Sequence, residues 1–141
     1  MEEDPFNLQR FVHAQVSTYA TALSELRAGG KRSHWIWYIF PQVEGLGFSA
    51  MSKRYAIVDV DEAKAYLAHP VLGPRLSECA DAVLSVQGRS ARQIMGSPDD
   101  MKLHSSMTLF AHVSDEGRVF HQVLDKYFDG AEDEATLRLI D

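Results

Sequence analysis

The N-terminal stretch DPFNLQRFVHAQVSTYATALSELRAGG, residues 4–30, shows the periodicity that decides the fold. Its apolar residues recur three or four positions apart, which is the spacing of one face of an α-helix. These residues are Leu8, Phe11, Val12, Val16, Tyr19, Leu23 and Leu26. Asp4 and Pro5 suit the cap and the first position of a helix, and Gly29-Gly30 suits its end. We therefore expect one long helix between these signals.

The same helical spacing continues through the rest of the chain, and no segment alternates apolar and polar residues as a strand would. The first expected helices are 34–40 capped by Ser33, one capped by Ser49 that ends near Ile57, and one capped by Asp59 or Asp61 that reaches about Ala68. The next runs from about Leu72 and is ended by Gly88, and 90–95 forms one or two further turns. The last are one with Ser97 as its cap and Pro98 as its first residue, then 118–128 and 134–140. The pattern predicts an all-α fold. We expect a compact orthogonal bundle of about seven to nine helices, forming a single domain over residues 1–141.

The size and charge of the chain exclude several classes of protein. Its 141 residues fit one domain, since domains centre on about 100–150 residues. A net charge of −6 disfavours binding to duplex nucleic acid, whose affinity depends on neutralising phosphates. No run reaches the roughly 18 apolar residues of a membrane span, and the start MEEDPFNLQRF lacks the basic and apolar regions of a signal peptide. We therefore expect a cytoplasmic protein with neither a membrane nor a duplex nucleic acid as partner.

The residue pattern gives little support to metal or covalent chemistry. Cys79 is the one cysteine, and its place between Leu76 and Val83 on a helical face suits a small buried hydrophobe. No two of the six histidines are four positions apart around an acid, as a helical zinc site requires. The GxSxG nucleophile turn and the glycine-rich phosphate loops are also absent. We expect no metal and no cofactor, and we assign no catalytic residue.

Residues 31–42, KRSHWIWYIFPQ, hold both tryptophans of the chain. Together with SKRY at 52–55 they lie in a region, 31–54, that has four cations against one anion in a chain of net charge −6. Aromatic faces beside cations suit a planar anionic ligand, because the ring can stack and the phosphate is neutralised. Two other interpretations stay open. One is an aromatic core with a basic rim, and the other is a surface for a partner protein.

A second cluster is the segment DDMKLHSSM. Lys102, Ser105 and Ser106 share one face of the predicted helix, and Asp99 and Asp100 lie at its start. The unpaired N–H groups at a helix start can hold an anion. Adjacent serines in mid-helix are equally typical of close helix packing, so both interpretations stay open for this segment.

Four strings, in this order, resemble the bacterial family catalogued as domain of unknown function 1810. They are DPFNLQRFVHAQ, KRSHWIWYIFPQVEGLG, AYLAHPVLGPRL and GSPDDMKLHSSMTLFA, and the resemblance extends over residues 4–140. Some members of that family carry a calpastatin-like label, but no segment here is similar to a calpain-inhibitor repeat. The resemblance implies a compact, mainly helical single domain, and it supplies no established function.

A weaker similarity concerns the end of the chain. MKLHSSMTLFA followed by VFHQVLDKYFDGAEDEATL is similar to the end of NADAR-type proteins, which are linked to cleavage of N-glycosidic bonds in ADP-ribose-type or riboside-phosphate compounds. The chain has Leu109-Phe110 where that pattern has Lys-Phe, and no glutamate matches a catalytic one. The similarity is an analogy at the level of the fold, and what it implies is an N-glycosidase-like hydrolase.

We predict a protein that binds a nucleotide-like or ADP-ribose or sugar-phosphate anion; whether it also hydrolyses the ligand stays open. The candidate ligand-binding residues are Lys31, Arg32, His34, Trp35, Trp37, Gln42, Arg54, Lys102 and Ser105. An N-glycosidase would need a carboxylate near the sugar, and the candidates are Asp99, Asp100 and Glu44. The alternative is a non-enzymatic adaptor that docks a partner protein on the aromatic segment around Trp35 and Trp37.

Overall fold

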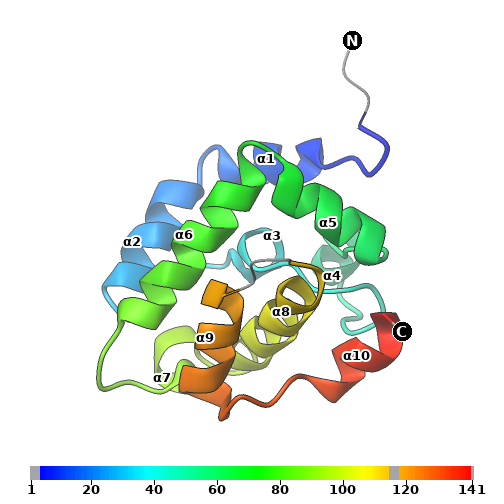
Figure 1. Ribbon diagram of the computed structural model, residues 1–141. Coiled ribbons are helices and arrows are strands. Elements are labelled where there is room, and N and C mark those ends of the chain that lie inside the picture. The colour runs from blue at the N-terminus through cyan, green and yellow to red at the C-terminus, as the bar shows by residue number, and fades with distance from the viewer. Residues whose placement is uncertain (1–3, 115–117, 141) are drawn as a thin grey trace.

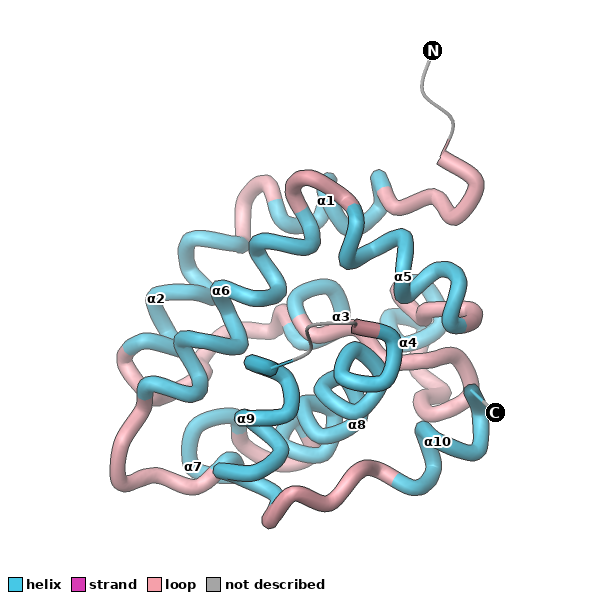
Figure 2. Tube along the Cα trace, viewed as in Figure 1, coloured by secondary structure: helices cyan, strands magenta, loops and turns pink. Residues whose placement is uncertain are grey.

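The computed structural model describes residues 4–114 and 118–140, and these form an all-α fold, as predicted (Figures 1 and 2). The helices are α1 Gln9–Gln15, α2 Tyr19–Arg27, α3 Ile36–Ile39, α4 Ala50–Arg54, α5 Val60–Ala68, α6 Leu72–Ser85, α7 Ala91–Met95, α8 Asp99–Val113, α9 Arg118–Phe128 and α10 Glu134–Ile140. Outside the helices, the described residues form one isolated bridge, between Val43 and Ile57. No helix in these ranges is both long enough and apolar enough to cross a membrane.

The N-terminal stretch forms two helices, α1 and α2, where the periodicity predicts one. The predicted start at Asp4 and Pro5 is wrong, because α1 begins at Gln9 and its N-cap residue is Leu8. The Asp4 carboxylate oxygens do accept hydrogen bonds from the backbone N–H groups of Leu8 and Gln9, at 2.7 and 2.9 Å. Val16 lies in the turn between the helices and is 78% exposed, although the pattern assigns it to the apolar face. This break brings the described helices to ten, against the seven to nine expected.

The break serves tertiary packing that a straight helix could not make. After it, α1 packs on α3 while α2 packs on α6, and Figure 1 shows α1 and α2 at different angles beside these partners. Gln15 ends α1 as a buried amide, donating to the carbonyl oxygen of Tyr38 at 2.7 Å. A buried amide needs such a partner, so this contact fixes where α1 ends against α3.

Two of the predicted helix caps, Ser49 and Asp59, are confirmed, and a third cap, Ser90, was not predicted. The Ser49 hydroxyl accepts from the backbone of α4, and the Asp59 carboxylate accepts from the backbone of α5. Ser90 forms a full capping box with Gln93 at the start of α7. In each case a short side chain with an oxygen acceptor precedes the helix and satisfies one of its unpaired N–H groups.

The caps predicted at Ser33 and Ser97 are wrong. Trp35 occupies the N-cap position of α3, and the Ser33 hydroxyl donates instead to the carboxylate of Glu25 at 2.6 Å. Pro98, not Ser97, is the N-cap residue of α8, and no side chain caps that helix. At Ser33 the contact with Glu25 of α2 replaces the local capping bond.

The interior of the fold is built around α8, which packs against α3, α5, α7, α9 and α10. From Leu103 to Ala111 every residue of α8 except His104 is buried. Figure 1 shows this helix in the middle of the bundle, with α9 and α10 beside it. The paired serines therefore lie in a tightly packed helix, in agreement with the packing interpretation.

Arg10 joins the N-terminal helix to the segment that follows α4. Its guanidinium group donates to the carbonyl oxygens of Arg54 and Ala56 at 2.9 and 2.8 Å, and it forms an ion pair with Glu62 at 2.8 Å. The exposed fractions of the Arg10 and Glu62 side chains are 13% and 1%. Such a buried, fully bonded pair fixes the C-terminal end of α4, and α4 forms part of the cavity described next.

Candidate functional site

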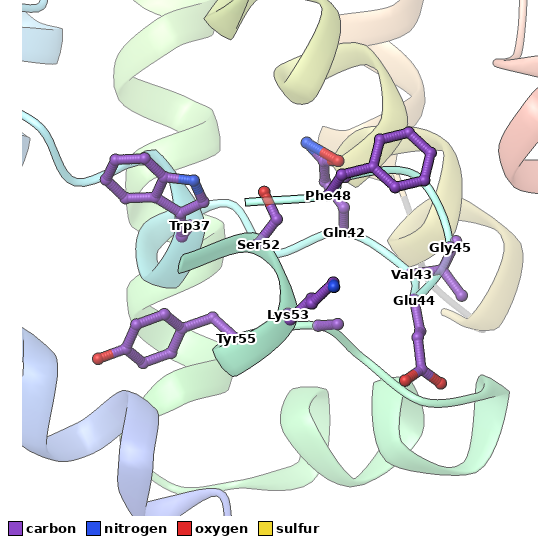
Figure 3. Close-up of a pocket in the computed structure, with 11 residues that line it drawn as sticks. Trp37, Gln42, Val43, Glu44, Gly45, Phe48, Ser52, Lys53 and Tyr55 are labelled. Carbon is purple, nitrogen blue, oxygen red and sulfur yellow. The ribbon is translucent and has the colours of Figure 1, made fainter. Parts of the chain in front are cut away.

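A cavity of about 320 Å³ lies between α3, the loop 42–48 and α4. We call it the Trp37 cavity. Trp37, Phe48 and Tyr55 are the aromatic residues among its lining. Figure 3 shows the Tyr55 ring directed away from Phe48, and this ring packs against Phe11 and Tyr38 in the core. Gln42, Ser52 and Lys53 are polar residues of the same lining. Ligand pockets in proteins span roughly 300–1,000 Å³, so this cavity has room for one ring system with its substituents.

Local backbone contacts explain why the loop and α4 enclose a cavity. The backbone N–H of Ile57 donates to the carbonyl oxygen of Gln42, and the N–H of Glu44 donates to that of Ile57, both at 2.8 Å. These bonds hold the loop against the segment after α4. At the other end of the loop, a Cβ atom on Gly47 would lie 2.5 Å from the Cβ of Ser52. Only glycine permits this approach, and the loop therefore closes over α4.

The polar groups of the cavity are mainly hydrogen-bond donors. The indole nitrogen of Trp37, Nε1, is buried and has no hydrogen-bond partner among the described residues. The Ser52 hydroxyl accepts from the Ser49 hydroxyl at 2.9 Å, which leaves the Ser52 proton to donate elsewhere. Lys53 is exposed and supplies an ammonium group. A cavity with this set of donors suits a ligand that is rich in acceptors.

Two lysines and Asp99 form a charge cluster beside the cavity. The Asp99 carboxylate lies 2.8 Å from the ammonium of Lys31 and 3.9 Å from that of Lys102. Lys102 lies over the Trp37 ring, 5.2 Å from its centre, and Lys31 lies 4.9 Å from the ring centre of Trp35. The Lys31 side chain is only 6% exposed. Asp99 therefore neutralises Lys31, and Lys102 is the member of this cluster that contacts the cavity lining.

Trp35 belongs to the core. Its side chain has no exposed area, and its indole N–H donates to the carboxylate of Glu25 at 3.0 Å. The same carboxylate accepts from the backbone N–H groups of Arg32 and Ser33, at 2.8 and 2.9 Å, and from the Ser33 hydroxyl. Burial by itself would raise the pKa of Glu25, but these hydrogen bonds outweigh it and lower the pKa to about 2. Glu25 thus orders the segment that precedes α3.

The remaining candidate residues do not meet at the cavity. Arg32 and His34 are exposed and are not part of its lining. The Arg54 guanidinium group lies 5.5 Å from the centre of the Tyr55 ring and outside the cavity lining. The Ser105 hydroxyl donates to a carboxylate oxygen of Asp133 at 2.8 Å and so helps to attach the start of α10 to α8. Of the nine predicted residues, Trp37 and Gln42 line the cavity, and Lys102 contacts it through Trp37.

Two aromatic lining residues, Tyr55 and Phe48, were not among the nine candidates, and the more exposed of the two is Phe48. Its side chain is 85% exposed, at the end of the loop that closes the cavity. The SKRY segment did mark α4 as part of a site, but Ser52, Lys53 and Tyr55 line the cavity rather than Arg54. The glycines before Phe48 were a usable signal, because a glycine-rich loop places its neighbouring side chains at the surface.

The candidate carboxylates do not form an acid–base pair at the cavity. Asp99 is bound to lysines, and Asp100 lies outside the lining with one side-chain oxygen buried and unbonded among the described residues. Glu44 lines the cavity, but Figure 3 shows its carboxylate directed away from Trp37 and Phe48. In residues 4–114 and 118–140 no three His, Cys, Asp or Glu side chains are grouped to hold a metal ion. None of the three candidate carboxylates is therefore paired with another at the cavity.

Cys79 lies in α6, and its side chain is buried, as the helical pattern suggests. Burial raises the pKa of its thiol to about 12. Because the thiolate is the reactive form of cysteine, this thiol has no nucleophilic character near neutral pH.

Comparisons with known proteins agree with this fold. The family described as Protein of unknown function (DUF1810) matches residues 5–140. The chain is also similar to the conserved hypothetical protein Rv1873 from Mycobacterium tuberculosis, whose crystal structure superimposes with a TM-score of 0.96 at 53% sequence identity, covering 97% of this chain and 98% of that one. No curated protein matches the chain. Neither description names a ligand, a partner or a reaction.

Proposed function

The chain belongs to the DUF1810 family, and from the geometry of the Trp37 cavity we propose that it binds a nucleotide-like anion. The ring of the ligand lies in the cavity, and its phosphate lies at the mouth. One observation carries this proposal. Trp37, Phe48 and Tyr55 are among the residues that line a space of about 320 Å³, and the polar groups of this lining are mainly donors.

The size of the space sets which part of a ligand it takes. At about 320 Å³ it is at the small end of ligand pockets, which span roughly 300–1,000 Å³. A single ring system with its substituents fits, whereas a dinucleotide such as ADP-ribose would place only one end inside. A ring that stacks on the exposed Phe48 side chain gains stacking energy, about 1–3 kcal/mol for each base in proteins that bind single strands.

Charge supports an anionic ligand at the mouth. Lys53 is exposed at the lining, and Lys102 lies over the Trp37 ring with its side chain 23% exposed. The one carboxylate of the lining, that of Glu44, is directed away from the aromatic walls in Figure 3. Two ammonium groups near the rim therefore favour a phosphate there. The proposal is for binding, since hydrolysis of a glycosidic bond would need a carboxylate beside the sugar.

Thermal unfolding with and without ligand tests this proposal. The panel holds nucleoside monophosphates, ADP-ribose and ribose 5-phosphate. A ligand at a hundred times its dissociation constant stabilises the fold by about 2.7 kcal/mol. We expect nucleotides to raise the melting temperature, and we expect Lys53→Gln and Phe48→Ala to weaken the effect. Lys64→Gln, at an exposed lysine of α5 outside the cavity lining, is the matched control and should behave like wild type.

Two outcomes would overturn the proposal. One is the absence of any shift across the panel. The other is a shift that survives both cavity substitutions, since the ligand would then bind elsewhere. Stabilisation by ribose 5-phosphate equal to that by nucleotides would show that the phosphate alone is recognised, which also contradicts a site built for a ring.

A second candidate function is favoured by the exposure of Phe48. An aromatic side chain that is 85% exposed is typical of an anchor for a partner protein, and interface hot spots are rich in aromatic residues. Because Trp35 is buried, an adaptor surface here would consist of Phe48 and Trp37. A partner that co-purifies with wild type and is lost on Phe48→Ala, while no ligand of the panel binds, would favour this function.

A further inference from the structure

The indole N–H of Trp37 is a buried donor without an acceptor among the described residues. Nearly all buried N–H groups in proteins are hydrogen-bonded, because an unpaired one has lost its bond to water and gained nothing. Trp37 also lines the cavity. A donor of this kind, at the wall of a binding site, marks a position where a bound molecule supplies the acceptor.

The neighbouring tryptophan shows that the fold can satisfy such a group. The Trp35 indole N–H donates to Glu25 at 3.0 Å, whereas the Trp37 N–H, two residues later, has no equivalent carboxylate. The Trp37 ring is nevertheless held in place, because the Lys102 ammonium lies 5.2 Å from its centre. Figure 3 shows the indole nitrogen on the edge of the ring that is nearest Ser52 and Gln42. The donor therefore faces the side on which the ligand lies.

The side-chain amide of Gln42 is the second group of this polar edge. No hydrogen bond to it is formed within the described residues, although its backbone carbonyl oxygen is bonded to Ile57. An amide side chain offers both a donor and an acceptor. Because it is not held, Gln42 can turn when a ligand enters, and side-chain rotations of this kind are common on binding. For a ligand to reach the buried Trp37 nitrogen the lining around it has to rearrange, and Gln42 is a lining residue whose side chain is free to move.

We infer that the Trp37 N–H and the Gln42 amide select ligands whose ring carries a carbonyl group beside a ring N–H. The carbonyl oxygen accepts from Trp37, and the ring N–H donates to the side-chain oxygen of Gln42. A ring with an exocyclic amino group at that place would point a donor at a donor. This inference rests on the proposed function and specifies the class of ring that the cavity binds.

Two pairs of nucleotides test this selection. Inosine and adenosine 5′-monophosphates differ by a carbonyl or an amino group at one ring position, and so do uridine and cytidine 5′-monophosphates. In calorimetric titrations of the wild-type protein we expect the carbonyl member of each pair to bind about tenfold more tightly, the ratio typical of one hydrogen bond. Trp37→Phe keeps an aromatic wall but removes the N–H, and we expect the ratio to fall to about one.

The matched control is the same substitution at the other tryptophan. Trp35→Phe removes an indole N–H in the core, so it should keep the tenfold ratio while lowering the melting temperature. The two variants also assign the two indole N–H resonances in a ¹H–¹⁵N spectrum. On addition of inosine 5′-monophosphate we expect the Trp37 resonance to move downfield, as a new hydrogen bond requires, and the Trp35 resonance to stay.

The outcomes distinguish failure of this inference from failure of the proposed function on which it rests. If both members of each pair bind equally, or if the ratio survives Trp37→Phe, the cavity binds nucleotides but the selection by Trp37 is refuted. A stationary Trp37 resonance with bound ligand also refutes it. If none of the four nucleotides binds, the proposed function fails and this inference fails with it.

Discussion

Replacement of Glu25 by glutamine tests how the segment before α3 is held. The carboxylate accepts four hydrogen bonds, from the backbone of Arg32, the backbone and hydroxyl of Ser33 and the indole of Trp35. Glu25→Gln keeps the size of the side chain but removes its charge and turns an NH₂ group toward these donors. We expect a loss of folding free energy at neutral pH, because hydrogen bonds to an ionised group are the stronger kind.

The lowered pKa of Glu25 gives the size of this loss. A pKa that falls from 4.5 to about 2 corresponds to about 3.4 kcal/mol. The carboxylate is partly exposed, so solvent screening reduces the figure, and we expect about 2 kcal/mol. The folded-state pKa lies below the unfolded one, so the unfolded chain binds more protons between these two values. The stabilisation is therefore complete above about pH 4.5 and is lost as the pH falls toward 2.

Urea unfolding of wild type and Glu25→Gln between pH 7 and pH 3 measures this effect. We expect the difference in unfolding free energy to be constant from pH 7 to about 5 and then to shrink. The matched control is Glu132→Gln, at an exposed glutamate before α10, which should stay within about 0.5 kcal/mol of wild type at every pH. A difference for Glu25→Gln that does not change with pH would refute the reasoning, since the charge would then contribute nothing.

Three further predictions concern the frame of the bundle and its thiol. A Cβ atom on Gly73 would lie 2.1 Å from a backbone carbonyl oxygen of α5, so Gly73→Ala should lower the free energy of unfolding in urea by about 1–3 kcal/mol. The control is Gly30→Ala, which should be close to neutral because its Cβ atom would have no neighbour within 4 Å. Arg10→Met leaves Glu62 buried without its cation and should cost about 3–5 kcal/mol, and the double variant Arg10→Met/Glu62→Leu should recover part of this loss; no recovery would contradict the argument. With its thiol pKa raised to about 12 by burial, Cys79 should not react with a disulfide reagent at pH 8 until urea unfolds the protein, and rapid reaction of the native protein would show that the thiol is accessible.

Helical periodicity was a sound guide wherever one helix face meets the core. The spacing of apolar residues predicted the fold class, and the caps predicted at Ser49 and Asp59 were correct. It failed at Val16, which continues the apolar pattern but lies exposed in a turn. The pattern shows which residues can lie on one face of a helix. It does not show whether packing against two different helices, here α3 and α6, breaks that helix in two.

For the candidate site, too, the sequence indicated the region but not which of its residues are available. Composition alone drew attention to the basic aromatic region that contains Trp37, Gln42 and the SKRY segment. It could not tell Trp37 from Trp35, because both are tryptophans in the same short segment beside the same cations. The difference comes from Glu25, which lies on another helix and binds only one of the two indoles.

By itself, the sequence determined that the chain is helical and that its aromatic and basic residues gather in residues 31–42 and 52–55. It could do so because local spacing and composition are properties of neighbouring residues. Only the tertiary structure decided which of them are available for a ligand. Lys31 is neutralised by Asp99, Trp35 enters the core, and Trp37 remains at a cavity with an unpaired N–H. These outcomes depend on partners far away along the chain, and the packing of helices brings those partners together.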